Sequence, residues 1–156
     1  MKKTFSIMML VFSTIIILSS CSKSETGNII NNSGNNGGNN GQGSAQWTFD
    51  GIAASSDSSF AYQSINRIMA YKDVTAVQSK IINLNLSSLS VGSYILSTTN
   101  PNVLRFRFST TVEHTSQSGT VNITSNTGTK LSGNYSALMD NGLTLTGTFI
   151  EVPIRP

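Results

Sequence analysis

The sequence has little of what most metal and enzyme sites are made from. Its 156 residues include one cysteine and one histidine, and only 11% of them are charged. A zinc site draws on several Cys and His ligands, and catalysis needs a nucleophile, a base and a charge stabiliser held together. We therefore expect no catalytic residue, no metal and no cofactor, and we expect that the protein is not an enzyme.

The single histidine, His114, stands next to Glu113. Neighbouring residues of a strand point to opposite faces of a sheet, so this pair is poorly placed to relay a proton. Glu113, Asp140 and Glu151 could in principle supply a glycosidase pair, but scattered carboxylates always allow some pair. We interpret His114 as a surface or loop-edge residue.

Long apolar runs are also scarce, and the clearest one lies at the N-terminus. Two lysines precede Phe5–Leu18, an uncharged and mostly apolar run of 14 residues. This is the anatomy of a secretory signal peptide, and the run is shorter than the roughly 20 residues of a membrane span. The Leu-Ser-Ser-Cys sequence that ends at Cys21 looks like the lipobox of bacterial lipoproteins. That resemblance implies cleavage between Ser20 and Cys21 and lipidation of the Cys21 thiol.

An ordinary signal peptide followed by an unmodified cysteine is the alternative. Two or three acyl chains on Cys21 would hold the protein durably, since each buried CH₂ contributes about 0.8 kcal/mol and one chain alone binds only marginally. Gly27–Gly43 is almost entirely Gly, Asn and Ser, a composition that cannot bury enough surface to fold. We expect a signal-peptide helix (residues 1–20), a lipidated cysteine and disordered tether (residues 21–45), and one folded domain (residues 46–156).

The predicted domain has almost no net charge. The whole chain carries +3, whereas residues 46–156 hold seven basic and six acidic residues, a net charge of +1. A nucleic-acid-binding domain should show a basic stripe, and along this sequence the two signs alternate. We therefore expect no nucleic-acid partner. The basic residues are Arg67, Lys72, Lys80, Arg105, Arg107, Lys130 and Arg155.

The domain is rich in Thr, Ser, Val, Ile and aromatic residues, and its apolar residues recur at period two, as in strands. Ile82–Leu86 is a clear example, and the longest run, Leu104–Val112, is expected to be a central strand. Ile65–Lys72 also suits a strand, with one helical turn as the alternative. We predict an all-β fold, a single antiparallel β-sandwich or flattened meander barrel of about 7–8 strands.

One pattern occurs twice, at Leu131–Tyr135 and again at Leu145–Phe149. Each copy reads Leu, hydroxyl residue, Gly, polar residue, aromatic, so Leu, Gly and the aromatic share one face. Glycine leaves room there for a neighbouring ring or a bend of the sheet, which favours a packing role over a ligand site. The apolar parity changes after Phe149, and this predicts a bulge near Phe149 and Ile150 or burial of both faces.

Together with Gly119–Thr124, the two copies resemble a family of small uncharacterised bacterial lipoproteins. In that family a lipobox and a polar linker precede an all-β domain. The resemblance is better over residues 92–154 than over residues 47–89, and it implies a fold but no catalytic residue. It also implies a lipid anchor in the bacterial outer membrane, with the domain facing either the periplasm or the outside.

These observations favour a membrane-anchored, non-catalytic module that binds a glycan, a peptide or an envelope protein. Flat aromatic rings stack on sugars and anchor interfaces, so Trp47 is a candidate ligand-binding residue, together with Arg105 and Arg107. The two arginines could form a binding edge with Glu113. The alternatives are packing of Trp47 in the core and a solvated strand face whose long side chains pair across strands. Further aromatic candidates are Tyr62, Tyr71 and Tyr94.

Two other functions are compatible with the sequence. A small closed barrel could carry a lipid-like ligand, and its cavity would then be lined by Phe106, Phe108, Tyr135 and Phe149. A filled core would argue against that function. A purely structural role in the envelope is the other possibility.

Overall fold

The structure is a computed structural model, and it describes residues 43–75 and 78–156. The predicted signal peptide, Cys21 and nearly all of the predicted tether lie outside these residues. The described part contains ten strands and one short 3₁₀ turn at Gln63–Ile65, which confirms the all-β class. The strands are β1 (Ser44–Phe49), β2 (Ile52–Ser55), β3 (Ser58–Tyr62), β4 (Arg67–Thr75), β5 (Gln78–Asn85), β6 (Gly92–Ser97), β7 (Val103–Arg107), β8 (Glu113–Asn126), β9 (Lys130–Met139) and β10 (Thr144–Arg155).

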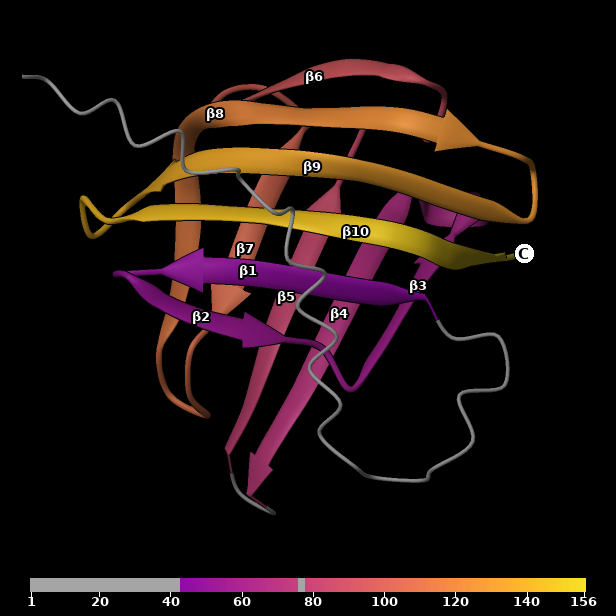
Figure 1. Cartoon of the computed structure of the whole chain (residues 1–156). Helices are drawn as coiled ribbons and strands as arrows, with labels where there is room; N and C mark the ends of the chain where they lie inside the picture. The colour runs from indigo at the N-terminus through magenta and orange to yellow at the C-terminus, as the bar shows by residue number, and fades with distance from the viewer. Residues whose placement is uncertain (1–42, 76–77) are drawn as a thin grey trace, which may run out of the picture. The chain divides into compact units, whose positions relative to one another are not determined.

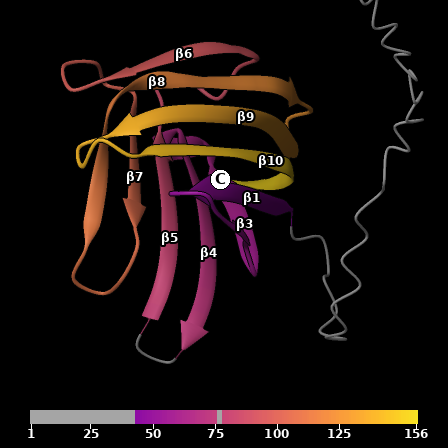
Figure 2. The same ribbon diagram turned by 60° about the vertical axis from the view of Figure 1, so that its left-hand side comes forward.

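Seven of the strands close into a barrel (Figures 1 and 2). They pair in the order β3-β4-β5-β7-β8-β9-β10, and the end of β10 returns to β3. Every pair in the ring is antiparallel except the last, in which Ile154 and Arg155 run parallel to Ala61 and Tyr62. A meander with an odd number of strands must close in this way, because its first and last strands point in the same direction. The structure therefore favours the barrel over the open sandwich, with one parallel pair where a wholly antiparallel sheet was expected.

The barrel is flattened into two layers. We call β2-β1-β10-β9-β8-β6 sheet A, and β3-β4-β5-β7 sheet B. The two long strands serve both layers: β8 pairs with β7 through Glu113–Thr115 and with β6 through Ser118–Ile123. Figure 1 shows the strands of sheet B crossing behind those of sheet A. The core lies between the layers, where Phe106 packs edge-on against Phe49 with ring centroids 4.9 Å apart.

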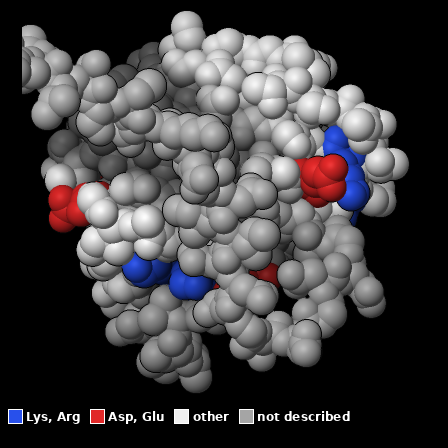
Figure 3. All heavy atoms as spheres, in the orientation of Figure 1, with Lys and Arg blue, Asp and Glu red and all other residues white. Residues whose placement is uncertain are grey.

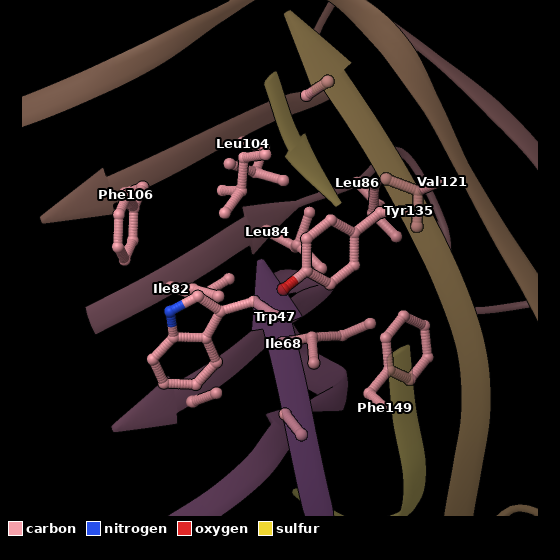
Figure 4. Close-up of a cluster of buried hydrophobic side chains, with 14 of the residues drawn as sticks. Trp47, Ile68, Ile82, Leu84, Leu86, Leu104, Phe106, Val121, Tyr135 and Phe149 are labelled. Carbon is pink, nitrogen blue, oxygen red and sulfur yellow. The ribbon is translucent and has the colours of Figure 1, made fainter. Parts of the chain in front are cut away.

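The repeated Leu-x-Gly-x-aromatic pattern lies on the adjacent strands β9 and β10, with both leucines and both rings buried. Gly133 pairs with Phe149, and Gly147 pairs with Tyr135. A Cβ on Gly133 would meet the Phe149 ring, and one on Gly147 would meet the Tyr135 hydroxyl. Each aromatic ring thus fills the space left by the glycine of the other copy. Figure 4 shows Tyr135 and Phe149 among the buried side chains, and the packing interpretation is confirmed.

The predicted bulge is present in β10. The register with β9 shifts between Phe149 and Val152, and Glu151 has a positive φ of 49°. The extra residue lets Phe149 and Val152 both point into the core, at 1% and 0% exposure, while Ile150 faces solvent at 52%. The bulge also bends the strand, so that its first half pairs with β1 and its end pairs with β3.

The strand predicted over Leu104–Val112 is shorter in the structure. β7 ends at Arg107, and the chain then turns, with the Phe108 amide donating to the Val112 carbonyl at 2.9 Å. The alternation continues past the strand because Ser109, Thr110 and Thr111 suit a turn as well as a strand. Phe108 keeps its ring 6.0 Å from that of Phe106 but is 39% exposed.

Ile65–Lys72 mostly forms a strand, since β4 begins at Arg67 and a 3₁₀ turn precedes it. Neither β2 nor β3 is among the strands predicted from the sequence. Within residues 43–75 and 78–156, no helix has the length and apolar character needed to cross a membrane.

Candidate functional site

All four arginines of the sequence lie on one surface, which is formed by the outer face of sheet B and by the end of β10 that pairs with β3. In β4, Ile68 and Ala70 are buried, so the alternate residues between and beside them point outward. In β7, Leu104 and Phe106 have no exposed surface, which turns Arg105 and Arg107 to solvent. We call this surface the arginine face. It consists of Phe60, Tyr62, Arg67, Met69, Tyr71, Asn83, Arg105, Arg107 and Arg155.

Strand pairing sets these side chains in rows across the sheet. One row runs Arg155, Tyr62, Arg67, Asn85 and Val103 from β10 to β7. The next row runs Phe60, Met69, Asn83 and Arg105. The third runs Ser58, Tyr71, Ile81, Arg107 and Glu113. Aromatic rings therefore occupy the β3–β4 side of the face, and two arginines occupy the β7 side.

Three half-buried rings form a cluster on β3 and β4. The Phe60 ring stacks on the Tyr71 ring with centroids 5.4 Å apart and meets the Tyr62 ring edge-on at 5.3 Å. The Arg155 guanidinium lies 4.1 Å from the Phe60 centroid, within the range of a cation–π contact. The Tyr71 hydroxyl points to the Met69 sulfur at 3.4 Å. These contacts hold the rings in place before any ligand arrives.

The four guanidinium groups differ in the contacts that they make with other side chains. The Arg67 Nε donates to Asn85 Oδ1 at 2.7 Å, and Arg107 lies 3.6 Å from the Glu113 carboxylate in an exposed pair. Arg155 is held over Phe60. Arg105 is exposed and makes no hydrogen bond or ion pair with the residues that the structure describes. Arg105 is therefore the cation most accessible to an incoming anion.

The centre of the face holds an unpaired acceptor. Asn83 lies between Met69 and Arg105, and its Oδ1 is buried with no hydrogen-bond partner among the described residues. A buried polar atom without a partner costs about 1–3 kcal/mol. A ligand donor that reached Asn83 would recover part of that free energy.

The arginines also act on the tyrosines electrostatically. Burial raises the pKa of Tyr71, and the neighbouring Tyr62 raises it further. Arg67, Arg107 and Arg155 act in the opposite direction because their positive charges favour a phenolate. Three arginines from three different strands thus place their field on one ring.

The outer face of sheet A has a different chemistry. One row across it consists of Ile95, Thr120, Ser136, Thr146 and Thr48. The next row is Ser93, Asn122, Asn134, Thr148 and Gln46. These rows carry hydroxyl and amide groups and no charge. In Figure 3 the described surface over β6 and β8 is accordingly free of red and blue.

His114 contacts residues distant in sequence and not its neighbour Glu113. Its Nδ1 lies 2.9 Å from Asp140 Oδ1, and its Nε2 lies 3.2 Å from the Asn141 amide nitrogen. Burial acts to raise the pKa of Asp140, but hydrogen bonds from the Thr115 amide and from His114 hold that pKa below its usual value. Both ring nitrogens of His114 are engaged, so the cluster fastens the β9–β10 turn to β8.

Trp47 lies apart from the two arginines with which it was grouped. It is 3% exposed and packs in the core, where its ring centroid is 6.3 Å from that of Phe106. This placement corrects the expectation that the Trp47 ring contacts a ligand. Its position on β1 follows the inward parity of Ala45 and Phe49, which are also buried.

The residues suggested for a lipid-binding cavity are largely core residues. Phe106, Tyr135 and Phe149 are at most 4% exposed and belong to one continuous hydrophobic core, which also contains Trp47 and Phe49. Side chains therefore fill this part of the barrel, which argues against a lipid-like ligand there. In the described residues, no group of three or more Cys, His, Asp or Glu could hold a metal ion.

A cleft of about 480 Å³ lies near the end of β10. Gln63, Asn126, Ile154 and Arg155 contribute to its lining. Because Arg155 also covers Phe60, this cleft adjoins the arginine face.

No protein-family model matches this chain, and no curated protein and no solved structure matches it either.

Phe60, Arg67 and Arg155 are candidates that the sequence pattern did not select. Arg67 and Arg155 come together only through β3, which pairs with both β4 and β10. The local signal was present, because Phe60 and Tyr62 alternate with buried Ser59 and Ala61. The parallel pairing that joins the two ends of the domain has no such local signal.

Proposed function

We propose that the protein is a lipid-anchored envelope lipoprotein whose barrel domain is a non-catalytic binding module. The arginine face contacts the partner, which is a glycan, a peptide or another envelope protein. The observation that carries this proposal is the gathering of every arginine of the chain around a preformed aromatic cluster. Arginine and aromatic residues are the types that dominate binding interfaces.

The different positions of the arginines and the lysines support the same proposal. An arginine at a solvated position needs no aromatic support, and lysine serves equally well there. Here the three lysines whose contacts are described lie elsewhere: Lys72 pairs with Asp57, Lys80 lies over Phe108, and Lys130 pairs with Glu151.

The binding test compares two double variants of the full-length protein. Arg105→Ala with Arg107→Ala removes two positive charges from the arginine face, and Lys80→Ala with Lys130→Ala removes the same charge elsewhere. Each protein is immobilised, exposed to detergent-solubilised envelope, and its bound material is identified by peptide and saccharide analysis. The proposal predicts a component that the parent and the lysine variant retain and the arginine variant loses. Identical bound material on all three proteins would contradict it.

The anchor is tested independently of binding. Cells that express the parent chain should incorporate labelled palmitate into the protein, whereas a Cys21→Ser variant should not. The variant should also leave the membrane fraction, because the anchor contributes most of the membrane affinity. Equal labelling of the two proteins would contradict lipidation at Cys21.

A further inference from the structure

We propose that the arginine face binds a polysaccharide that carries carboxylates, a polyuronate. This inference rests on the proposed function above and specifies its ligand. A guanidinium group is planar and presents several N–H donors, so it matches a carboxylate with two parallel hydrogen bonds. Arg105 has its donors available, and Arg107 and Glu113 are only loosely paired at 3.6 Å.

The spacing of the arginines suits a ligand with several anionic groups. Arg105 and Arg107 are alternate residues of β7, so their Cα atoms are about 7 Å apart. Arg67 on β4 lies two strands from β7, a distance of roughly 10 Å, and Arg155 lies two strands farther on. A single carboxylate could engage one end of this face, whereas a repeating acidic chain could engage both.

The groups between the arginines suit hydroxyls. Asn83 Oδ1 lies buried at the centre of the face and has no partner among the described residues. A ligand hydroxyl that reached it would supply the missing donor, which a carboxylate cannot do. Tyr62 and Tyr71 carry phenolic hydroxyls on the same face. A uronic acid residue offers both hydroxyl donors and a carboxylate, which matches the alternation of polar and cationic groups.

The aromatic cluster argues against nucleic acid as the occupant. Proteins that bind single strands use open rings on which successive bases stack. Here the Phe60 ring already contacts Tyr71 and Arg155, so the rings pack on one another.

The test uses the full-length protein purified in detergent and two forms of one polymer. Polygalacturonate carries free carboxylates, and its highly methyl-esterified form has the same sugar chain with the charge removed. We expect the protein to bind polygalacturonate at least tenfold more tightly than the esterified form. We also expect the affinity for polygalacturonate to fall as salt screens the charges. Arg105→Ala with Arg107→Ala should weaken it at least tenfold, and Lys80→Ala with Lys130→Ala less than twofold.

A second double variant, Arg105→Lys with Arg107→Lys, separates the effect of the guanidinium geometry from an effect on folding. It keeps the charge and loses the planar fork. This variant should bind with intermediate affinity and unfold at the same urea concentration as the parent. Affinity equal to that of the parent would overturn the role assigned to the guanidinium geometry.

The other outcomes separate the two proposals. Equal binding of both polymer forms would overturn the role of carboxylates, and equal or tighter binding of dextran sulfate or single-stranded DNA would overturn polyuronate selectivity. If polygalacturonate is not bound but the arginine-dependent envelope component is, the polyuronate inference fails and the proposed function stands. If neither is bound, both fail.

Discussion

Gly133 and Gly147 occupy positions where a neighbouring strand supplies the side chain. The Tyr135 ring lies over Gly147, and the Phe149 ring lies over Gly133. Glycine weakens a strand interior because it packs nothing and is flexible when unfolded. The reciprocal arrangement offsets that cost, since each ring buries apolar area above a bare backbone.

Gly147→Ala should destabilise the protein by about 1–3 kcal/mol, the usual cost of inserting atoms into a packed core. The new Cβ would meet both the Tyr135 hydroxyl and the Gln46 carbonyl oxygen. The free energy of unfolding is measured by urea denaturation. Thr146→Ala, an exposed change on the same strand, is the control and should alter it by less than about 0.5 kcal/mol. Equal effects of the two substitutions would contradict the packing described for the glycine.

Tyr135→Phe should reduce the loss of free energy of unfolding at alkaline pH. The Tyr135 hydroxyl is buried without a hydrogen-bond partner in the described residues, and burial raises the pKa of Tyr135 far above its usual value. Since the unfolded chain ionises near pH 10, the free energy of unfolding falls as the pH rises above about 10. Between pH 9 and pH 11 the parent should lose about 1.4 kcal/mol more than the variant. Tyr71 is present in both proteins, so its contribution cancels, and parallel losses would contradict burial of the Tyr135 hydroxyl.

At the scale of the element, the bulge in β10 sets how the barrel closes. Phe149 and Val152 both reach the core only because Ile150 and Glu151 occupy the space opposite one residue of β9. Glu151 adopts a φ of 49° there, in the left-handed region that costs a side chain about 1–2 kcal/mol.

Glu151→Gly should therefore be more stable than Glu151→Ala by about 1 kcal/mol. Both variants lose the ion pair with Lys130, which is 3.1 Å long but exposed, so it contributes little. Thermal unfolding of the two proteins side by side measures the difference. A more stable alanine variant would show that the bulge does not impose this backbone conformation.

Strand identity could be predicted from the sequence more reliably than strand ends. The period-two pattern identified Ile82–Leu86 and both copies of the Leu-x-Gly-x-aromatic pattern, and the parity change revealed the bulge. It failed over Phe108–Val112, because alternation of apolar and hydroxyl residues persists through a turn. It also failed at β2, which has no buried residue, and at β3, where the large residues Phe60 and Tyr62 lie on the outward side.

At the scale of the whole molecule, the distribution of charge could not be predicted from the order of residues. Basic and acidic residues alternate along the chain, which suggested a scattered surface. Barrel closure instead brings Arg67, Arg105, Arg107 and Arg155 to one face. The sequence pattern indicates Arg105 and Arg107 because they lie on one face of one strand. Arg67 and Arg155 depend on pairings between distant segments, which a local pattern does not contain.

Under the proposed function, a partner in the cell envelope covers the arginine face. Labelling of arginines with phenylglyoxal, in intact envelope and in purified full-length protein, measures this cover. Because every arginine of the chain lies on this face, the reagent reports on it alone, and lysine acetylation of Lys80 and Lys130 serves as the control. We expect Arg105 and Arg107 to react readily in the purified protein and to be protected in the envelope, while the lysines react equally in both. Equal arginine labelling in the two samples would show that no partner covers the arginine face.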